Sequence, residues 1–245
     1  GREYNITKSL SSLFYSYYYK LCEPLIWTSA ASCLSNREDE SQVIQNYNKN
    51  VSVVPTRVFY NLTKVDYKTF NAKNKEKIDF LFVGGIGNAP NISAVDFIID
   101  QLIDELNSGL SREWRIHIVG SGWKEYLADK KTPYNNIIVY GVVSDSRLDE
   151  LYEQCFFSLA TLQFGSGVKG KVIEAMLHSL VVITTPIGSE GIDCKTLKSC
   201  LTAECMVNEC NKFLMDKDFW QLTVDGYYDY LNENLNGKNC IFSHP

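Results

Sequence analysis

The residues that decide the fold read Phe164-Gly-Ser-Gly-Val-Lys169-Gly-Lys171-Val-Ile-Glu174-Ala-Met176. They begin as a glycine-rich turn and continue as an amphipathic helix. Glycines let the backbone approach a ligand closely, and the first turn of a helix offers unpaired N–H groups and the positive end of its dipole. Lys169 and Lys171 add positive charge there, and Glu174 lies one turn further along. The stretch therefore predicts a site for a phosphate joined to a hydroxyl-bearing unit, as in a nucleotide.

Short apolar runs alternate with helical patterns on both sides of this turn. Strands are predicted at 78–83, 114–119, 136–140, 156–159 and 180–184, and helices at about 92–106, 124–128, 145–154, 169–178, 204–215 and 217–235. This alternation is typical of an α/β fold, a Rossmann-like parallel sheet flanked by helices. Ligands of such sheets bind beyond the carboxyl ends of the strands. The glycines that follow the strands are therefore expected at one binding edge.

The N-terminal part does not follow this alternation. Residues 8–34 are rich in Leu, Tyr, Phe and Trp and predict one long helix interrupted near Pro24. A second, short helix opens at Asn36, and Val51–Pro55 predicts a strand ended by proline. Residues 61–77 are polar and lysine-rich, as in a linker. A separate helical region therefore precedes the sheet.

Composition excludes several classes of protein. The chain has 245 residues, 45% hydrophobic residues and a net charge of −5, so a general binder of nucleic acid backbones is not expected. Its eight cysteines show no C-x-x-C spacing and its three histidines are scattered, so no metal site is expected. Free thiols in a reducing compartment are favoured over a disulfide framework. With no apolar run near the ~20 residues that span a bilayer and no signal-peptide core, a cytoplasmic location is expected.

Several motifs occur in a fixed order along the chain. They are Phe82-Val-Gly84, Pro90-Asn91, Val119-Gly-Ser-Gly122, Gly141-x-x-Ser-Asp145, Gly165-Ser-Gly-Val-Lys169-Gly-Lys171-Val-Ile-Glu174-Ala and Thr184-Thr-Pro-Ile-Gly188-Ser-Glu190-Gly191. In this order and spacing they resemble the C-terminal, donor-binding half of the family 4 retaining GT-B glycosyltransferases. The resemblance covers about residues 50–235. It implies that 1–50 are a helical remnant of the N-terminal acceptor half, 51–235 a nucleotide-sugar donor-binding domain and 236–245 a tail.

The resemblance implies transfer of a sugar, with retention, from a UDP- or GDP-sugar to a glycan or lipid-linked acceptor. Neither a metal nor another cofactor is expected, because Lys169 or Lys171 would neutralise the diphosphate. Lys169 and Glu174 are the expected catalytic residues, and Glu174 would accept hydrogen bonds from the two ribose hydroxyls. Gly141 would read the base, and Glu190 would border the sugar. The expected donor-binding residues are Gly84, Gly85, Gly141, Gly165, Ser166, Gly167, Val168, Lys169, Lys171, Glu174 and Glu190.

The chain departs from the family pattern at a few positions. Ser166 stands where many members have a second glutamate, and Gln163 stands where arginine is common. Ser179 and Val181 replace the usual Gly and Pro after the helix. The acceptor half is absent, which predicts either a truncated chain or a half that comes from another chain. The expected protein partners are such a separate N-terminal half or further copies of this chain in a homo-oligomer.

Other interpretations remain open. The first is a catalytically incomplete nucleotide-sugar-binding module that needs a separate N-terminal half. The second is an unrelated doubly wound protein such as an epimerase, although the pair Tyr60-x-x-x-Lys64 lies outside the strand–helix alternation. A nicotinamide cofactor at 84–87 is disfavoured, because the third glycine and the acidic ribose ligand are missing. The tyrosine-rich helix around Tyr15–Tyr19 could face the missing half, another copy or a membrane surface.

Overall fold

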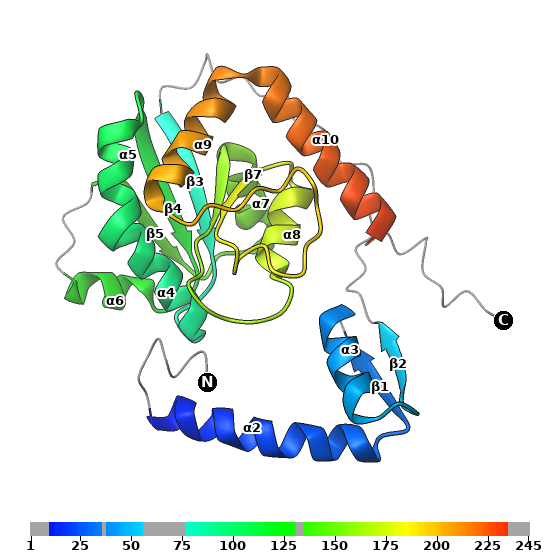
Figure 1. Cartoon of the computed structure of the whole chain (residues 1–245). Helices are drawn as coiled ribbons and strands as arrows, with labels where there is room; N and C mark the ends of the chain where they lie inside the picture. Colours follow the sequence, from blue (N-terminus) through cyan, green and yellow to red (C-terminus); the bar gives the residue numbers. More distant parts are fainter. Residues whose placement is uncertain (1–9, 36–37, 56–76, 131–134, 235–245) are drawn as a thin grey trace. The chain divides into compact units, whose positions relative to one another are not determined.

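The computed structural model of the chain describes residues 10–35, 38–55, 77–130 and 135–234 (Figure 1). The chain divides into two compact units. The first unit contains residues 1–59 and 164–168, and the second contains residues 60–163 and 169–245. The predicted linker up to residue 76, the pair Tyr60 and Lys64, and the predicted tail 236–245 lie outside the described residues. The division into 1–50, 51–235 and 236–245 stays a prediction.

The first unit contains α2 (Leu10–Ser29), β1 (Ser32–Ser35), α3 (Glu38–Tyr47) and β2 (Ser52–Pro55). β1 and β2 pair in parallel, with Ser32 opposite Ser52. The predicted interruption near Pro24 is wrong, because α2 continues through this residue; a proline removes one hydrogen bond and can bend a helix without ending it. The predicted helix to residue 34 is also wrong, because β2 supplies a strand partner that no local pattern shows.

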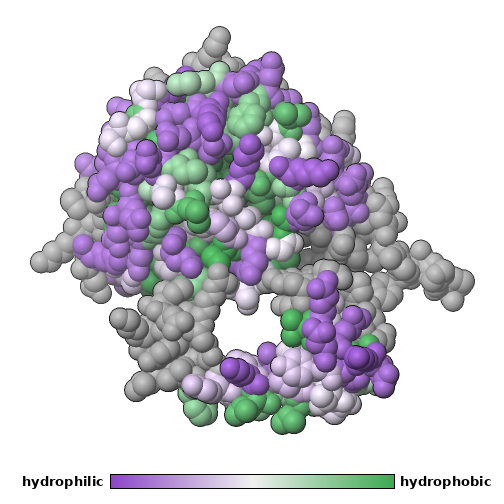
Figure 2. All heavy atoms as spheres, viewed as in Figure 1, coloured by the Kyte–Doolittle hydropathy of each residue, from purple (hydrophilic) through white to green (hydrophobic). Residues whose placement is uncertain are grey.

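The surface of α2 carries exposed apolar side chains. Phe14, Leu21 and Leu25 are each more than 60% exposed, at 67%, 68% and 69%. Figure 2 shows green, hydrophobic surface among pale and purple surface where Figure 1 draws α2. None of the helices that the structure describes is both long enough and apolar enough to cross a membrane.

The second unit is built on a parallel sheet of five strands in the order β5-β4-β3-β6-β7. Its strands are β3 (Lys77–Val83), β4 (Glu113–Val119), β5 (Ile137–Gly141), β6 (Phe157–Ala160) and β7 (Val181–Thr184). Its helices are α4 (Ala89–Phe97), η2 (Ile98–Leu102), α5 (Ile103–Gly109), α6 (Trp123–Asp129), α7 (Asp145–Gln154), α8 (Gly170–Leu177), α9 (Ala203–Met215) and α10 (Lys217–Asn234). The predicted α/β, Rossmann-like fold is confirmed.

Helices cover both faces of this sheet (Figure 1). On one face Phe157 of β6 stacks on Phe80 of β3, with ring centroids 5.2 Å apart, and contacts Phe213 of α9. On the other face Asp79 of β3 accepts a hydrogen bond from Gln154 of α7. Successive residues of β3 therefore serve opposite layers, as the two-residue period of a strand requires.

The strand order reverses between β3 and β6. From β3 the chain proceeds through β4 to β5 on one side, whereas β6 is followed by β7 on the other side. The loops that leave β3 and β6 therefore diverge, and in open parallel sheets this switch point forms the ligand-binding crevice. The turn at Gly84 leaves β3 here, and the segment that leads to α8 leaves β6 here.

Candidate functional site

Three glycine turns are joined at the carboxyl edge of the sheet. The N–H of Gly84 donates to the carbonyl of Val119 at 2.8 Å, and the N–H of Gly120 donates to the carbonyl of Gly141 at 2.8 Å. Gly120 has φ +141°, and a Cβ there would lie 2.3 Å from the carbonyl oxygen of Gly84. Only glycine fits this position, so the ends of β3, β4 and β5 are held in contact.

Two buried side chains fix the backbone after β3. The indole Nε1 of Trp123 donates to the carbonyl of Gly84 at 2.6 Å, and Nδ2 of Asn91 donates to the carbonyl of Gly85 at 2.9 Å. Trp123 is fully buried, and Asn91 is also buried. Because both carbonyl groups have protein partners, the loop holds one orientation.

The ammonium group of Lys171 lies against this loop. Its Nζ donates to Oδ1 of Asn91 at 2.6 Å and stands 4.5 Å from the ring centroid of Phe82. A Cβ on Gly84 would come within 2.7 Å of this Nζ, so the glycine makes room for the lysine. Burial, and then the nearby charge of Lys169, lower the pKa of Lys171 to about 8. The first turn of α8 thus places a cation at the switch point.

A second cation lies at the start of the same helix. Lys169 is the N-cap residue of α8, and its Nζ lies 3.6 Å from Oε2 of Glu190. The side chains are only 11% and 22% exposed, so solvent screens this ion pair weakly. Glu190 follows β7, in the turn that contains Gly188. The pair connects the segments that follow β6 and β7.

The remaining predicted site residues fall at different distances from Lys171. Glu174 lies one turn further along α8 and is partly exposed. Gly141 lies two strands from Gly84, and its carbonyl accepts the hydrogen bond from Gly120 on the strand between them. Gly165, Ser166, Gly167 and Val168 form the turn before α8, with φ of +124° at Gly165 and +79° at Gly167. The structure therefore gathers Gly84, Gly85 and Lys171 in one cluster and Lys169 and Glu190 in a second.

Sequence reasoning missed several residues that shape this site. Trp123, Asn91 and Tyr152 were assigned no role there, although Pro90-Asn91 belonged to the motif series. The sequence signal for Trp123 was its position directly after Gly122. In the structure this glycine has φ +82° and starts the helix that carries the tryptophan. A polar Asn at the start of a buried helix was the comparable signal for Asn91.

A buried polar network reaches the Gly141 turn from within the sheet. Asp79 accepts hydrogen bonds from Arg115 at 2.7 Å, and Nε2 of His117 lies 3.1 Å from the same carboxylate. Nδ1 of His117 lies 2.9 Å from the hydroxyl of Tyr140, which precedes Gly141. Burial favours a raised pKa for Asp79, but the bonds from His117 and Arg115 outweigh it and lower the pKa to about 2. His117 itself is a core residue, since it is 1% exposed.

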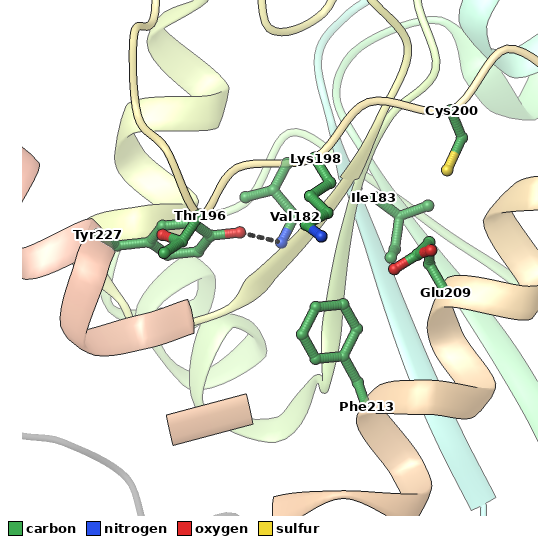
Figure 3. Close-up of a pocket in the computed structure, with 8 residues that line it drawn as sticks. All are labelled: Val182, Ile183, Thr196, Lys198, Cys200, Glu209, Phe213 and Tyr227. Atoms are coloured by element: carbon green, nitrogen blue, oxygen red, sulfur yellow. Dashed lines mark hydrogen bonds between the residues drawn. The ribbon is translucent and has the colours of Figure 1, made fainter. Parts of the chain in front are cut away.

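A separate pocket lies beside the edge strand β7 (Figure 3). Lys198 and the carboxylate of Glu209 point into it, and the hydroxyl of Tyr227 accepts a hydrogen bond from the N–H of Val182. The lining residues are Val182, Ile183, Thr196, Lys198, Cys200, Glu209, Phe213 and Tyr227. None of them belongs to the glycine turns, so this pocket is distinct from the switch-point site.

Within the described ranges, no group of three or more His, Cys, Asp or Glu side chains is placed to hold a metal ion. The charges that gather at the switch point are the ammonium groups of Lys169 and Lys171 and the carboxylate of Glu190. Such a set suits an anionic ligand better than a cation.

Residues 77–216 match the family model described as "Glycosyl transferases group 1". This stretch contains the whole five-stranded sheet and both clusters of charged site residues. No curated protein matches the chain in sequence.

Solved structures share the fold at low sequence identity. A variant of TarM from S. aureus, in complex with fondaparinux, alpha-GlcNAc-glycerol and UDP, has a TM-score of 0.67 and 14% identity, and the match covers 88% of this chain and 44% of that one. Anabaena HepE in complex with UDP-glucose has a TM-score of 0.63 and 12% identity, with 86% and 62% covered. A trehalose-6-phosphate synthase, studied for glycosyltransfer with retention, has a TM-score of 0.63 and 8% identity, with 83% and 57% covered. The chain thus spans about half the length of these proteins, and the likeness establishes the GT-B type of fold.

Proposed function

Because the chain belongs to the group 1 glycosyltransferases, we propose that its second unit binds a nucleotide diphosphate sugar at the switch point between β3 and β6. The whole protein would transfer the sugar to a glycan or lipid-linked acceptor with retention and without a metal. The observation that carries the proposal is the pair of lysines at the start of α8. Lys171 faces the Gly84 loop, and Lys169 stands at the helix N-terminus.

The diphosphate would lie over the N-terminus of α8. Backbone N–H groups in the first turn of α8 and the positive end of the helix dipole attract an anion. Lys169 and Lys171 would neutralise its charge, which the departing diphosphate of the reaction needs most. Glu190, 3.6 Å from Lys169, would exchange that contact for one to the sugar when the donor arrives.

The nucleoside would extend along α8 and toward β5. Glu174 is one turn beyond Lys171 and has two oxygens that can accept from the two ribose hydroxyls. Gly141, tied to Gly120 and backed by Tyr140, would border the base. UDP is the first nucleotide to test, because the solved structures of TarM and HepE were obtained with UDP or UDP-glucose.

Titration calorimetry with UDP, UMP, GDP and UDP-glucose, first without metal and then with Mg²⁺, tests this proposal. We expect saturable binding without metal and a preference for UDP over UMP. Lys169→Ala should weaken the affinity for UDP about tenfold or more and reduce the preference for UDP over UMP, because it removes a charge-assisted contact to the diphosphate. Glu174→Ala should weaken the affinities for UDP and UMP by the same factor. Lys217→Ala, an exposed lysine on α10, is the matched control.

An alternative function is a nucleotide-sugar-binding module without transferase activity of its own. Because the chain spans 44% of the TarM structure that it matches, binding and transfer are tested separately. Hydrolysis of UDP-α-glucose, followed by NMR, separates the two proposals. Release of α-glucose as the first product supports a retaining transferase, whereas β-glucose contradicts retention. Tight binding with no turnover favours the binding module.

A further inference from the structure

Tyr152 of α7 packs against the helix that carries Glu174. Its ring lies parallel to the imidazole of His178, with centroids 4.3 Å apart and 3° between the ring planes. His178 is the C-cap residue of α8 and comes four residues after Glu174, so the two side chains occupy successive turns of one helix face. The Tyr152 side chain is therefore held beside the turn that presents Glu174.

The hydroxyl of Tyr152 is buried without completing a hydrogen bond to any described residue. The whole residue is only 1% exposed. A buried hydroxyl without a partner loses its hydrogen bonds to water and gains none from the protein, so native proteins rarely keep one without a reason. The position of this hydroxyl thus requires an explanation that core packing does not supply.

The carboxylate of Glu174 is the group that acts most strongly on this hydroxyl. Burial raises the pKa of Tyr152 far above its ordinary value, and the charge and hydrogen-bonding reach of Glu174 raise it further. The two groups interact, although no hydrogen bond of ordinary geometry joins them. A phenol that stays protonated is a ready donor beside a carboxylate that can only accept.

We propose that Tyr152 is a positioning residue for the donor ribose: its hydroxyl donates to Glu174 when that carboxylate receives the ribose diol. The inference rests on the ribose role given to Glu174 in the proposed function. A carboxylate has about four acceptor sites, enough for two ribose hydroxyls and one phenol. The donation from Tyr152 would fix the Glu174 side chain in a single orientation.

This arrangement couples Tyr152 to ribose hydroxyls that it does not touch. Tyr152→Phe keeps the ring and its stack on His178 and removes only the hydroxyl oxygen. We expect the variant to bind UDP about fivefold to tenfold more weakly and to bind 2′,3′-dideoxy-UDP as the unchanged chain does. Its melting temperature should stay the same or rise, because the lost hydroxyl had no hydrogen bond in the unliganded protein.

Tyr227→Phe is the matched control. Tyr227 is likewise 1% exposed, but its hydroxyl accepts a hydrogen bond from Val182, beside the edge strand. This variant should lose stability and should leave the affinity ratio of UDP to 2′,3′-dideoxy-UDP unchanged. Glu174→Gln is measured in parallel and should lose the preference for the ribose hydroxyls.

The four proteins and two nucleotides separate the possible outcomes. If Glu174→Gln loses the ribose preference while Tyr152→Phe keeps it, the role of Tyr152 is refuted and the proposed function stands. If Glu174→Gln keeps the preference, the ribose assignment fails and this inference fails with it. If Tyr152→Phe lowers the melting temperature and weakens binding of both nucleotides equally, Tyr152 has a structural role only, and its role toward the ribose is refuted. Absence of binding by the unchanged chain overturns both proposals.

Discussion

The Nζ of Lys171 lies 2.6 Å from Oδ1 of Asn91, while Nδ2 of the same amide donates to the carbonyl of Gly85 at 2.9 Å. One buried amide therefore connects a charge on α8 with the backbone that leaves β3. The lysine is held in a cradle that Gly84 keeps open, since any Cβ there would come within 2.7 Å of both Nζ and Nδ2. This relationship sets the behaviour of the site toward pH, substitution and ligand.

Affinity for UDP should fall as the pH rises through about 8. The pKa of Lys171 is lowered to about 8 by burial and by Lys169, and a bound diphosphate would raise it. Binding is then strongest below the pKa of the free protein and weakens by up to tenfold per pH unit above it. Calorimetry at pH 6.5, 8 and 9 in buffers of different ionisation enthalpy measures both the affinity and the proton uptake. A Lys171→Gln chain should show neither effect; an identical pH profile in that chain would contradict the assignment.

Lys171→Met should stabilise the protein while it weakens ligand binding. The folded state lowers the pKa of Lys171 below its ordinary value of 10.5, so it opposes the charged form, and a methionine of similar shape removes that penalty. We expect the free energy of unfolding to rise by roughly 1–3 kcal/mol at pH 7. Urea unfolding at pH 7 and pH 10 checks the sign. The advantage of the variant should shrink at the higher pH, where wild-type Lys171 is already neutral.

Gly84→Ala should damage the site far more than Gly87→Ala. Gly84 has φ +150°, and its new methyl group would collide with Asn91 and Lys171, whereas nothing lies within 4 Å of a Cβ on Gly87. We expect Gly84→Ala to weaken the affinity for UDP at least about tenfold. Gly87→Ala should change the free energy of unfolding by less than about 0.5 kcal/mol. Thermal melts and calorimetry of both chains test this. Equal effects of the two substitutions would show that the cradle around Lys171 is unimportant.

Acid should remove the contribution of Asp79 to the free energy of unfolding between about pH 4 and pH 2. The pKa of Asp79 is lowered from its ordinary value of 3.8 to about 2, because hydrogen bonds from His117 and Arg115 outweigh burial. A lowered carboxyl pKa adds stability above the unfolded value, and protonation of the folded state removes it. The free energy of unfolding should fall by roughly 2 kcal/mol over this range. Urea unfolding at a series of pH values measures this loss. Asp79→Asn should lower stability by about 3 kcal/mol at pH 7 and flatten the curve over this range.

The sheet could be predicted from the sequence because its strands are short apolar runs, three of which end at a glycine: Gly84, Gly120 and Gly141. All five predicted strands match the observed ones within two residues, from β3 at Lys77–Val83 to β7 at Val181–Thr184. β1 escaped prediction because the segment Ser32–Ser35 becomes a strand only through pairing with Ser52–Pro55. The prediction at Pro24 was wrong because a proline removes one hydrogen bond and can bend a helix without ending it.

The site could be predicted only where one motif contained its residues. The run from Gly165 to Glu174 carries its own chemistry, and so its lysines were found. The contact between Lys171 and Asn91 joins residues 80 positions apart, and no local spacing indicates it. The stack of Tyr152 on His178 depends likewise on how α7 and α8 pack. Such contacts follow from the crossover connections of a parallel sheet, which place distant segments side by side.

The two carbonyl groups that Trp123 and Asn91 hold have a kinetic consequence. A loop that is already ordered in the free protein has little conformational entropy left to lose when a ligand arrives. Encounter with the nucleotide should then be a single step whose rate is set by diffusion and by the attraction of the lysines. Stopped-flow traces should fit one exponential, with a rate that rises linearly with nucleotide concentration and falls with added salt.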